Sequence, residues 1–266
     1  MRFSAVLVSF LLFFGVASAF GAEKKTILVG TQPVNVGTSY LDDKGHLTGY
    51  EVEVLREINR RLPEYKFEFK TMDFGTLFIE LSAKKLDVIT SNIQWSPDRE
   101  KKYLLTKEIF YATPYRLTVK GNDDKIKTFE DLKGKKIALL GTGAQAKVLA
   151  DFVAARKLDV EIVPGKSNTE IINLLFSNRV DALFLPEHQA LVFKKYRGFD
   201  LKTVDKGVIA DYMTPEKAGA RFALDKGNEV LRDRLDWALR EIRKDGTLRK
   251  LSLEWFDKDL TVYNPN

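Results

Sequence analysis

The chain contains no cysteine, and this absence excludes several kinds of site. Without thiols it forms no disulfide, holds no zinc through thiolates and has no cysteine nucleophile. A lipid attached to a cysteine behind a leader peptide is excluded as well, so free diffusion after export is expected. Histidine is also scarce: neither His46 nor His188 has a second ligand at a metal-binding spacing. We therefore predict no metal and no cofactor.

The sequence also lacks the dense basic runs, interleaved with aromatic residues, that bind nucleic acid. Its formal charge is +6, from 43 lysines and arginines against 37 acids. The basic residues are dispersed in pairs such as Lys84-Lys85 and Lys194-Lys195, with acids between them. Dispersed charge of this kind is typical of a solvated surface. We expect no nucleic-acid partner.

Long apolar runs are missing except at the N-terminus. There the run Ala5–Val16 follows Arg2 and precedes the small-x-small tripeptide at 17–19. This order is typical of a secretory signal peptide. An uncleaved membrane anchor is the alternative, but the run is shorter than the ~20 residues that a spanning helix needs. Residues 1–19, extending at most to residue 22, are predicted to be cleaved on export.

The rest of the chain alternates between short apolar segments and amphipathic ones. Apolar residues in 51–62 fall at helical spacing, and Pro63 follows them. Segments predicted as strands are 26–30, 65–72, 86–91, 116–120, 136–140, 159–163, 180–185 and 220–224. Segments predicted as helices are 51–62, 76–85, 144–156, 168–178, 186–196, 229–244 and a last one ending near 255–256. Such alternation favours an α/β fold with parallel sheets covered by helices.

The stretch 47–99 carries the most specific pattern. GYEVE at 49–53 gives a glycine, an aromatic, an acid, an aliphatic residue and an acid, and SPDR at 96–99 places Arg99 just past a predicted strand. In open α/β sheets, ligands sit outside the carboxyl ends of the strands. These motifs, together with KDGTLRKLSLEWF at 244–256, resemble the periplasmic amino-acid-binding proteins of ABC importers. The resemblance covers nearly all of the chain after the signal.

This resemblance implies a type II periplasmic-binding-protein fold. Two α/β lobes with mainly parallel sheets would be joined by a two-stranded hinge, with the crossings near 111–114 and 215–220. Lobe 1 would contain residues 23–112 and 218–266, and lobe 2 residues 113–217. The implied function is capture of a small polar amino acid in the periplasm, by hinge closure, and delivery to an ABC permease of the inner membrane. Within the family, the segments LTGYEVEVLREINRRLPEYKFEFKTMDF and PDREKKYLLT are most similar to cystine-type binders. A monomer is expected.

Arg99 is the main candidate for ligand binding. A guanidinium holds a carboxylate through two parallel, charge-assisted hydrogen bonds, which lysine cannot do. Spacing alone favours a surface arginine paired with Asp98 or Glu100, since charge runs are mostly solvated. The resemblance implies that Arg99 holds the ligand carboxylate.

The other candidates of the first lobe lie at predicted strand ends. The resemblance implies that Ser91, Asn92 and Gln94 contact the amino acid. Gln94 also fits ordinary loop polarity. Phe74 takes a position that packs on the ligand or, alternatively, belongs to the core. Gln32 and Asn35 replace an acid and an aromatic residue that are common in the family, so a cationic ligand side chain is not expected there.

In the predicted second lobe, Gly143, Ala144 and Gln145 join a strand to a helix. Amide groups at a helix N-terminus attract anions, although the segment is neither a Walker loop nor a full GxGxxG motif. The resemblance makes it the second lobe's part of the carboxylate site, through the amides of Gly143 and Ala144.

Pro186 is the clearest departure from the family pattern, because an aspartate usually stands there and pairs with the ligand's α-ammonium. The neighbouring Glu187 either substitutes for it or is an exposed acid in the first turn of a helix. Two alternative functions remain open for this reason. One is an enzyme of the same fold, similar to cyclohexadienyl or arogenate dehydratase, with Glu187 as general acid. The other is a ligand-sensing partner of a receptor.

Overall fold

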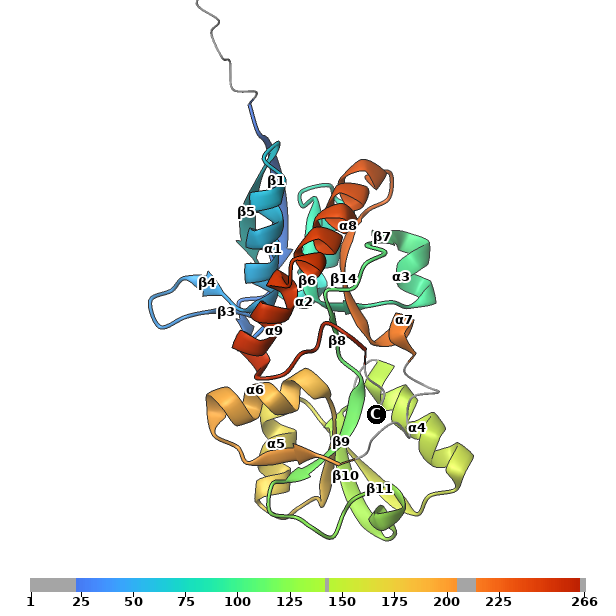
Figure 1. The fold of residues 1–266 in the computed structure, drawn as a ribbon. Coiled ribbons are helices and arrows are strands. Elements are labelled where there is room, and N and C mark those ends of the chain that lie inside the picture. Colours follow the sequence, from blue (N-terminus) through green and yellow to red (C-terminus); the bar gives the residue numbers. More distant parts are fainter. Residues whose placement is uncertain (1–22, 142–143, 205–213, 264–266) are drawn as a thin grey trace, which may run out of the picture.

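A computed structural model of the protein describes residues 23–141, 144–204 and 214–263. The predicted signal peptide and Gly143 lie outside these residues, as does the side chain of Ala144. Figure 1 shows two α/β lobes, one above the other, each built on its own sheet. The prediction of two α/β lobes is therefore confirmed. No helix in the described part of the chain is long and apolar enough to cross a bilayer.

The sheet of the first lobe has the strand order β5-β1-β6-β14-β7, with the short β8 paired to the start of β14. Its strands are β1 (Lys25–Thr31), β5 (Tyr65–Thr71), β6 (Val88–Gln94), β7 (Tyr103–Leu105), β8 (Tyr111–Ala112) and β14 (Gly219–Asp225). Strands β1, β5 and β6 are parallel, so their carboxyl ends meet at one edge. This edge carries the predicted binding residues of the first lobe.

Helices cover both faces of this sheet. They are α1 (Tyr50–Arg61), α2 (Phe74–Ser82), α3 (Pro97–Lys102), α8 (Glu229–Lys244) and α9 (Thr247–Phe256). Helices α1, α8 and α9 pack on one another, and α2 packs on β1, β6 and β14. A small separate sheet of β2 (Val34–Asn35), β3 (Ser39–Leu41) and β4 (Leu47–Thr48) lies between β1 and α1 in the sequence.

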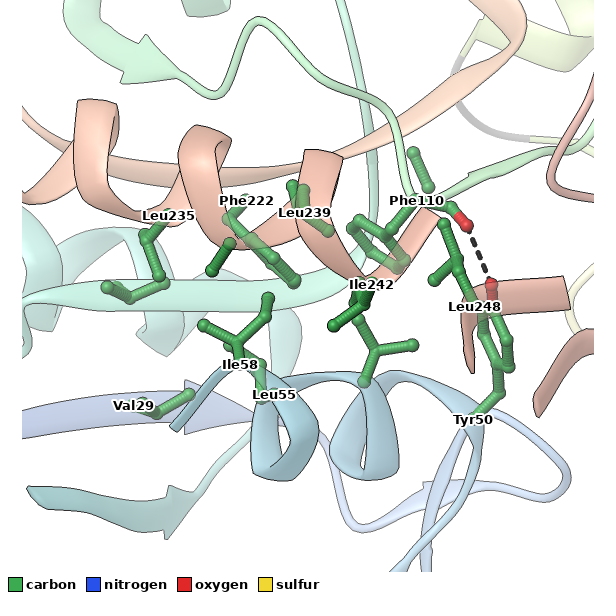
Figure 2. Close-up of a cluster of buried hydrophobic side chains, with 14 of the residues drawn as sticks. Val29, Tyr50, Leu55, Ile58, Phe110, Phe222, Leu235, Leu239, Ile242 and Leu248 are labelled. Atoms are coloured by element: carbon green, nitrogen blue, oxygen red, sulfur yellow. Dashed lines mark hydrogen bonds between the residues drawn. The ribbon is translucent and has the colours of Figure 1, made fainter. Parts of the chain in front are cut away.

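The core of the first lobe fixes the start of α1. Figure 2 shows Leu55 and Ile58 of α1 in one cluster with Leu239 of α8, and all three are fully buried. At the end of this cluster the hydroxyl of Tyr50 donates a 2.6 Å hydrogen bond to the carbonyl of Phe110. The first turn of α1 is therefore tied to the residue that precedes β8, where the chain leaves the first lobe.

The second lobe has the strand order β11-β10-β12-β9-β13. Its strands are β9 (Tyr115–Lys120), β10 (Lys135–Leu140), β11 (Val160–Gly165), β12 (Ala182–Pro186) and β13 (Leu201–Thr203). Its helices are η1 (Glu130–Leu132), α4 (Ala144–Arg156), α5 (Asn168–Phe176) and α6 (Glu187–Arg197), and the short α7 (Pro215–Ala218) precedes β14. Helix α6 also contacts α9 of the first lobe.

Both sheets contain antiparallel strands, whereas the sequence had suggested mainly parallel ones. In the first sheet β14 is antiparallel to β6, β7 and β8, and in the second β9 is antiparallel to β12 and β13. The physical reason is the path of the chain, because β9 and β14 are the strands that carry it from one lobe into the other. Alternation of strands and helices does not reveal this, since a returning strand has the same apolar pattern in either direction.

Several elements differ from the prediction, and those nearest the predicted site are β6, α3, β7 and the start of α6. Strand β6 continues to Gln94 instead of ending at residue 91, because the buried Ile93 pairs with Arg221 of β14. Helix α3 and strand β7 were not predicted, since PDREKK is too short and too polar to show periodicity. Pro186 is the last residue of β12 and the N-cap of α6, so the helix begins at Glu187 rather than at the proline.

The crossings and the C-terminal segment meet at the lobe boundary. The N–H of Thr113 donates to the carbonyl of Ala218 at 2.8 Å, which joins the two crossings. The N–H of Ala112 donates to the carbonyl of Leu260 at 2.7 Å. Beyond it, Tyr263 packs against the core of the second lobe. The segment after α9 therefore runs along the boundary as a third connection (Figure 1).

Candidate functional site

Arg99 lies in the first turn of α3, just past the end of β6. Ser96 caps this helix by accepting a hydrogen bond from the N–H of Arg99. The guanidinium donates to the carbonyl of Gln94 at 2.8 Å, and no carboxylate lies within ion-pairing distance of it among the described residues. The alternative of a surface pair with Asp98 or Glu100 is therefore not what the structure shows. Burial lowers the pKa of Arg99 from its usual value, but an arginine remains charged.

Two phenylalanine rings of α2 face this guanidinium. The Arg99 Cζ atom lies 5.9 Å from the ring centre of Phe74 and 5.8 Å from that of Phe78. The two rings contact each other edge to face, 5.3 Å apart. Asp73 starts the helix by accepting a 3.0 Å hydrogen bond from the N–H of Thr76. The rings keep Arg99 in place without neutralising its charge.

Gln94 connects the first lobe to the crossing between lobes. Its side-chain amide donates to the hydroxyl of Thr113 at 2.9 Å, and its side-chain oxygen accepts from the hydroxyl of Tyr115 at 3.2 Å. Burial raises the pKa of Tyr115 to about 12, so this hydroxyl stays protonated and can donate. Gln94 is thus part of an ordered network rather than a free loop residue.

Ser91, Gln32 and Asn35 form a second polar group at the same edge. The Ser91 hydroxyl donates to the Gln32 Oε1 atom at 2.6 Å, and the Asn35 Nδ2 atom donates to the same oxygen at 3.2 Å. The structure therefore brings these three predicted residues together. Gln32 keeps its Nε2 group without a hydrogen-bond partner among the described residues, so that donor is available to a ligand.

Asn92 is held by a buried carboxylate that the sequence had shown only as part of a motif. Its N–H donates to Glu51 Oε1 at 2.9 Å, and the hydroxyl of Tyr111 donates to the same oxygen at 2.8 Å. Thr90 donates to the other oxygen. Asn92 has φ 48°, a left-handed conformation that asparagine adopts more readily than most residues. Burial raises the pKa of Glu51.

In the second lobe, the predicted residues after β10 contribute less than expected through side chains. Helix α4 begins at Ala144, so its first amides lie at the carboxyl end of β10, while Gly143 lies outside the described residues. Gln145 is buried, and its side-chain amide donates to the carbonyl of Phe184 in β12. That contact fixes α4 against the sheet and occupies the side-chain amide of Gln145.

Glu187 is not the exposed acid that one interpretation of the sequence required, since its exposed fraction is 5 %. One oxygen of its carboxylate contacts Lys258, and the other lies 3.4 Å from the Nε atom of Arg116. Lys258 belongs to the segment after α9, whereas Arg116 lies in β9. Glu187 therefore joins the two lobes in a charge cluster in which both of its oxygens already have cations.

Sequence reasoning missed several residues that organise the site. Thr113 and Tyr115 order Gln94, Phe78 contacts Arg99, and Lys258 pairs with Glu187. No local signal marks them, because each acts through a residue distant in the sequence. Glu51 could have been found, since an acid beside a buried tyrosine at a helix start needs donors. Within the described ranges, no group of three potential metal ligands is present.

A pocket lies between the lobes next to the Ser91–Gln32–Asn35 group. Its volume is about 260 Å³, and its walls come from Asn35 and its neighbours in the first lobe and from α5 and α6 in the second. Asn35 is the residue that belongs both to the hydrogen-bonded group and to this pocket. The predicted site therefore continues into a space between the lobes.

Comparison with known proteins agrees with this architecture. Residues 27–258 match the bacterial extracellular solute-binding proteins, family 3. The L-cystine-binding protein TcyK of Bacillus subtilis is 36% identical over 268 residues, covering 97% of this chain and 96% of that protein. The L-cystine-binding protein TcyJ of Escherichia coli is 31% identical, covering 90% of this chain and 85% of that protein.

Solved structures show the same two-lobed fold. The probable amino-acid ABC transporter extracellular-binding protein ytmK of Bacillus subtilis has a TM-score of 0.81 at 36% identity, covering 89% of this chain and 100% of that one. The L-cystine solute receptor of Neisseria gonorrhoeae, in an unliganded open conformation, has a TM-score of 0.72 at 29% identity, covering 91% of this chain and 97% of that one. The family match spans most of the sequence, and this chain therefore belongs to family 3 of the bacterial extracellular solute-binding proteins.

Proposed function

We propose that this protein captures a small polar amino acid, with cystine as the favoured ligand, and delivers it to an ABC permease. The observation that carries this proposal is the guanidinium of Arg99. It is positioned by a helix cap and two aromatic rings and has no carboxylate partner among the described residues. Arg99 is half-buried, so its charge is partly removed from water, and a ligand carboxylate that pairs with it makes a strong charge-assisted interaction. Relatives named as L-cystine-binding proteins support the choice of ligand.

The contacts proposed for the ligand follow from this anchor. The carboxylate of the ligand binds Arg99, and Phe74 packs on the apolar part of the ligand. The remaining polar groups of the ligand contact polar side chains of the first lobe, namely Ser91, Asn92, Gln94, Gln32 and Asn35. In the second lobe the amides of Gly143 and Ala144 complete the carboxylate site. The side chain of Gln145 holds that helix against the sheet through its hydrogen bond to the carbonyl of Phe184. Glu187 is proposed to act on the lobe boundary, since its oxygens are occupied by Lys258 and Arg116.

Capture is proposed to occur by closure of the lobes about the two crossings. The predicted boundaries, 23–112 with 218–266 against 113–217, fit the sheets, because β8 pairs with β14 and β9 pairs with β12 and β13. The C-terminal segment departs from a clean division, since Tyr263 packs on the second core. A ligand shifts the equilibrium towards the closed form by its differential affinity for that form.

The working environment is proposed to be the periplasm, with the signal peptide removed and the protein acting as a monomer. Family membership as an extracellular binding protein supports export. We propose no enzymatic activity. The dehydratase alternative needed Glu187 as a free acid, and no observation favours that role over the ion pairs that Glu187 makes. The receptor-partner alternative has no specific observation in its favour.

Binding to the mature chain, unfolded and refolded to remove carried ligand, tests this proposal. A ligand at ~100 times its dissociation constant adds ~2.7 kcal/mol to the free energy of unfolding. For a chain of this size the midpoint of thermal unfolding rises by roughly 5–10 °C. With L-cystine we expect that rise, and Arg99→Ala should weaken binding about 100-fold, because a charge pair is lost. Calorimetric titration gives the dissociation constants.

Two further variants sharpen the test. Arg99→Lys keeps the charge but not the planar fork, so its affinity should fall between those of the wild type and Arg99→Ala. Arg240→Ala removes an exposed arginine of α8 and should leave binding unchanged. The proposal fails if no α-amino acid binds, or if Arg99→Ala binds the ligand as tightly as the wild type does.

A further inference from the structure

We propose that the pocket between the loop carrying Asn35 and helices α5 and α6 is a second subsite, which receives the far charged end of a double-headed amino acid. This proposal rests on the amino-acid-binding function proposed above. The first end of such a ligand is the α-carboxylate held by Arg99, and the second is another amino and carboxylate group at the other end of the molecule. Cystine is the simplest ligand of this class, because its disulfide joins two identical amino-acid ends.

The position of the pocket supports this assignment. Its volume of about 260 Å³ is enclosed by Asn35 from the first lobe and by Asn168, Gln189 and Arg197 from the second. A ligand that reaches it therefore contacts both lobes. Movement of one lobe on the other changes the width of the pocket, so an occupant there has a differential affinity for the closed form.

The lining of the pocket is chemically suited to a charged amino-acid end. Amides come from Asn35, Asn168 and Gln189, a cation comes from Arg197, and Val192 and Phe193 add apolar surface. Arg197 is exposed and makes no ion pair with any residue that the structure describes. A second carboxylate has this guanidinium as a partner, and amide oxygens suit an ammonium.

The amides are held in place by contacts among themselves. The Asn168 Nδ2 atom donates to Gln189 Oε1 at 3.2 Å, and Gln189 Nε2 lies 3.1 Å from His188 Nε2. Since an amide nitrogen only donates, His188 accepts at that atom. The Asn168 Oδ1 atom is buried and has no partner among the described residues. An unsatisfied acceptor of this kind is unfavourable, and a ligand ammonium that reached it would remove the penalty.

Hydrogen bonds connect this pocket to Ser91 of β6, and the backbone of that strand leads on towards Arg99. Asn35 donates to Gln32, which also accepts from Ser91 in the middle of β6. A ligand anchored at Arg99 that extends past Ser91 and Gln32 therefore enters the pocket. A short amino acid leaves the pocket to water, whereas a double-headed one fills it. The pocket thus selects for ligands with a second charged end.

The test compares two ligands that differ only in their far end. L-cystine has two amino-acid ends, and the mixed disulfide of L-cysteine with 2-mercaptoethanol keeps the first end and the disulfide but replaces the second end with a hydroxyl. Arg197→Gln removes the pocket's cation from an exposed position, so folding should be unaffected. Lys194→Gln removes one positive charge from the same helix at an exposed residue outside the pocket, and it is the matched control.

Calorimetric titration of both ligands into the wild type and the two variants gives the result. We expect the wild type to prefer L-cystine, and Arg197→Gln to weaken L-cystine about tenfold, the loss of one hydrogen bond to a charged group. The mixed disulfide should bind Arg197→Gln and the wild type equally well, and Lys194→Gln should change neither ligand. Gln189→Ala should give the same selective loss as Arg197→Gln.

Two outcomes overturn the subsite. One is an equal loss of both ligands in Arg197→Gln, and the other is no loss of either ligand in Arg197→Gln while Arg99→Ala still weakens binding. If the proposed function itself is wrong, the titrations give a different result, because the wild type then binds neither ligand. In that case the subsite proposal falls with the function on which it rests.

Discussion

Each lobe buries one glutamate at the start of a helix beside the lobe boundary, but the two carboxylates are held in different ways. Glu51, at the second position of α1, accepts hydrogen bonds from neutral donors alone among the described residues: Thr90, Tyr111 and the N–H of Asn92. Glu187, the first residue of α6, lies between two cations. Both have exposed fractions of 5 % or less, so the difference is one of partners and not of burial.

The comparison shows how each lobe uses its charges. Among the residues that the structure describes, the anion Glu51 of the first lobe has no cation beside it, and the cation Arg99 has no anion. That arrangement leaves a positive charge free for a ligand. In the second lobe Glu187 is compensated by Lys258 and Arg116, so it joins the lobes instead of offering a charge to a ligand. Burial of an acid near the boundary therefore does not by itself indicate a ligand contact.

The largest effect on stability is expected from Glu187→Ala. Removal of one partner from a buried ion pair typically lowers the free energy of unfolding by about 3 kcal/mol. Urea-induced unfolding of the mature chain measures this loss. Glu229→Ala is the matched control, since Glu229 is also the first residue of a helix but is exposed. A loss no larger than in that control would show that the cluster contributes nothing to stability.

A smaller, pH-dependent effect is expected from Glu51→Gln. Burial raises the pKa of Glu51 above its usual value of 4.5, so the folded state holds an unfavourable charge at neutral pH. The folded state binds the proton more tightly than the unfolded state does. As the pH falls from neutral towards 4.5, the wild type therefore gains stability relative to Glu51→Gln. Urea titrations of both proteins across this range measure the difference.

The Glu51→Gln variant retains every other titrating group, so it serves as the control for all of them. A stability difference that is independent of pH would mean that Glu51 titrates alike in both states. It would remove the contrast between a carboxylate held by neutral donors and one held by cations.

The smallest effect is expected from Tyr115→Phe. This change removes the 3.2 Å hydrogen bond to Gln94, and one neutral hydrogen bond contributes about 1 kcal/mol. The dissociation constant of the ligand should rise about fivefold, as measured by calorimetry. Tyr65→Phe, at a half-buried tyrosine in the first lobe, should leave it unchanged. A loss as large as that of Arg99→Ala would mean that Tyr115 contacts the ligand itself.

Local patterns were sufficient for most of the elements. The long helix α8 has the bounds that its apolar spacing predicted, because 16 residues give several complete turns of periodicity. Helix α3, with six residues and none of them buried, gives no such signal. Strand β6 was ended too early for a related reason. Asn92 and Gln94 at its end are polar, and only the pairing of Ile93 and Gln94 with β14 makes this end part of the sheet.

The sequence by itself determined the alternation of strands and helices, the family, and Arg99 as the candidate for carboxylate binding. These depend on spacing and on motifs within one segment, which are local properties of the chain. Tertiary structure alone decided that Glu187 pairs with Lys258, 71 residues away, and that the side chain of Gln145 supports α4. It also decided that Arg99 has no acidic partner among the described residues. Ion pairs and hydrogen bonds act over a few ångströms, so they depend on which distant segments the fold brings together.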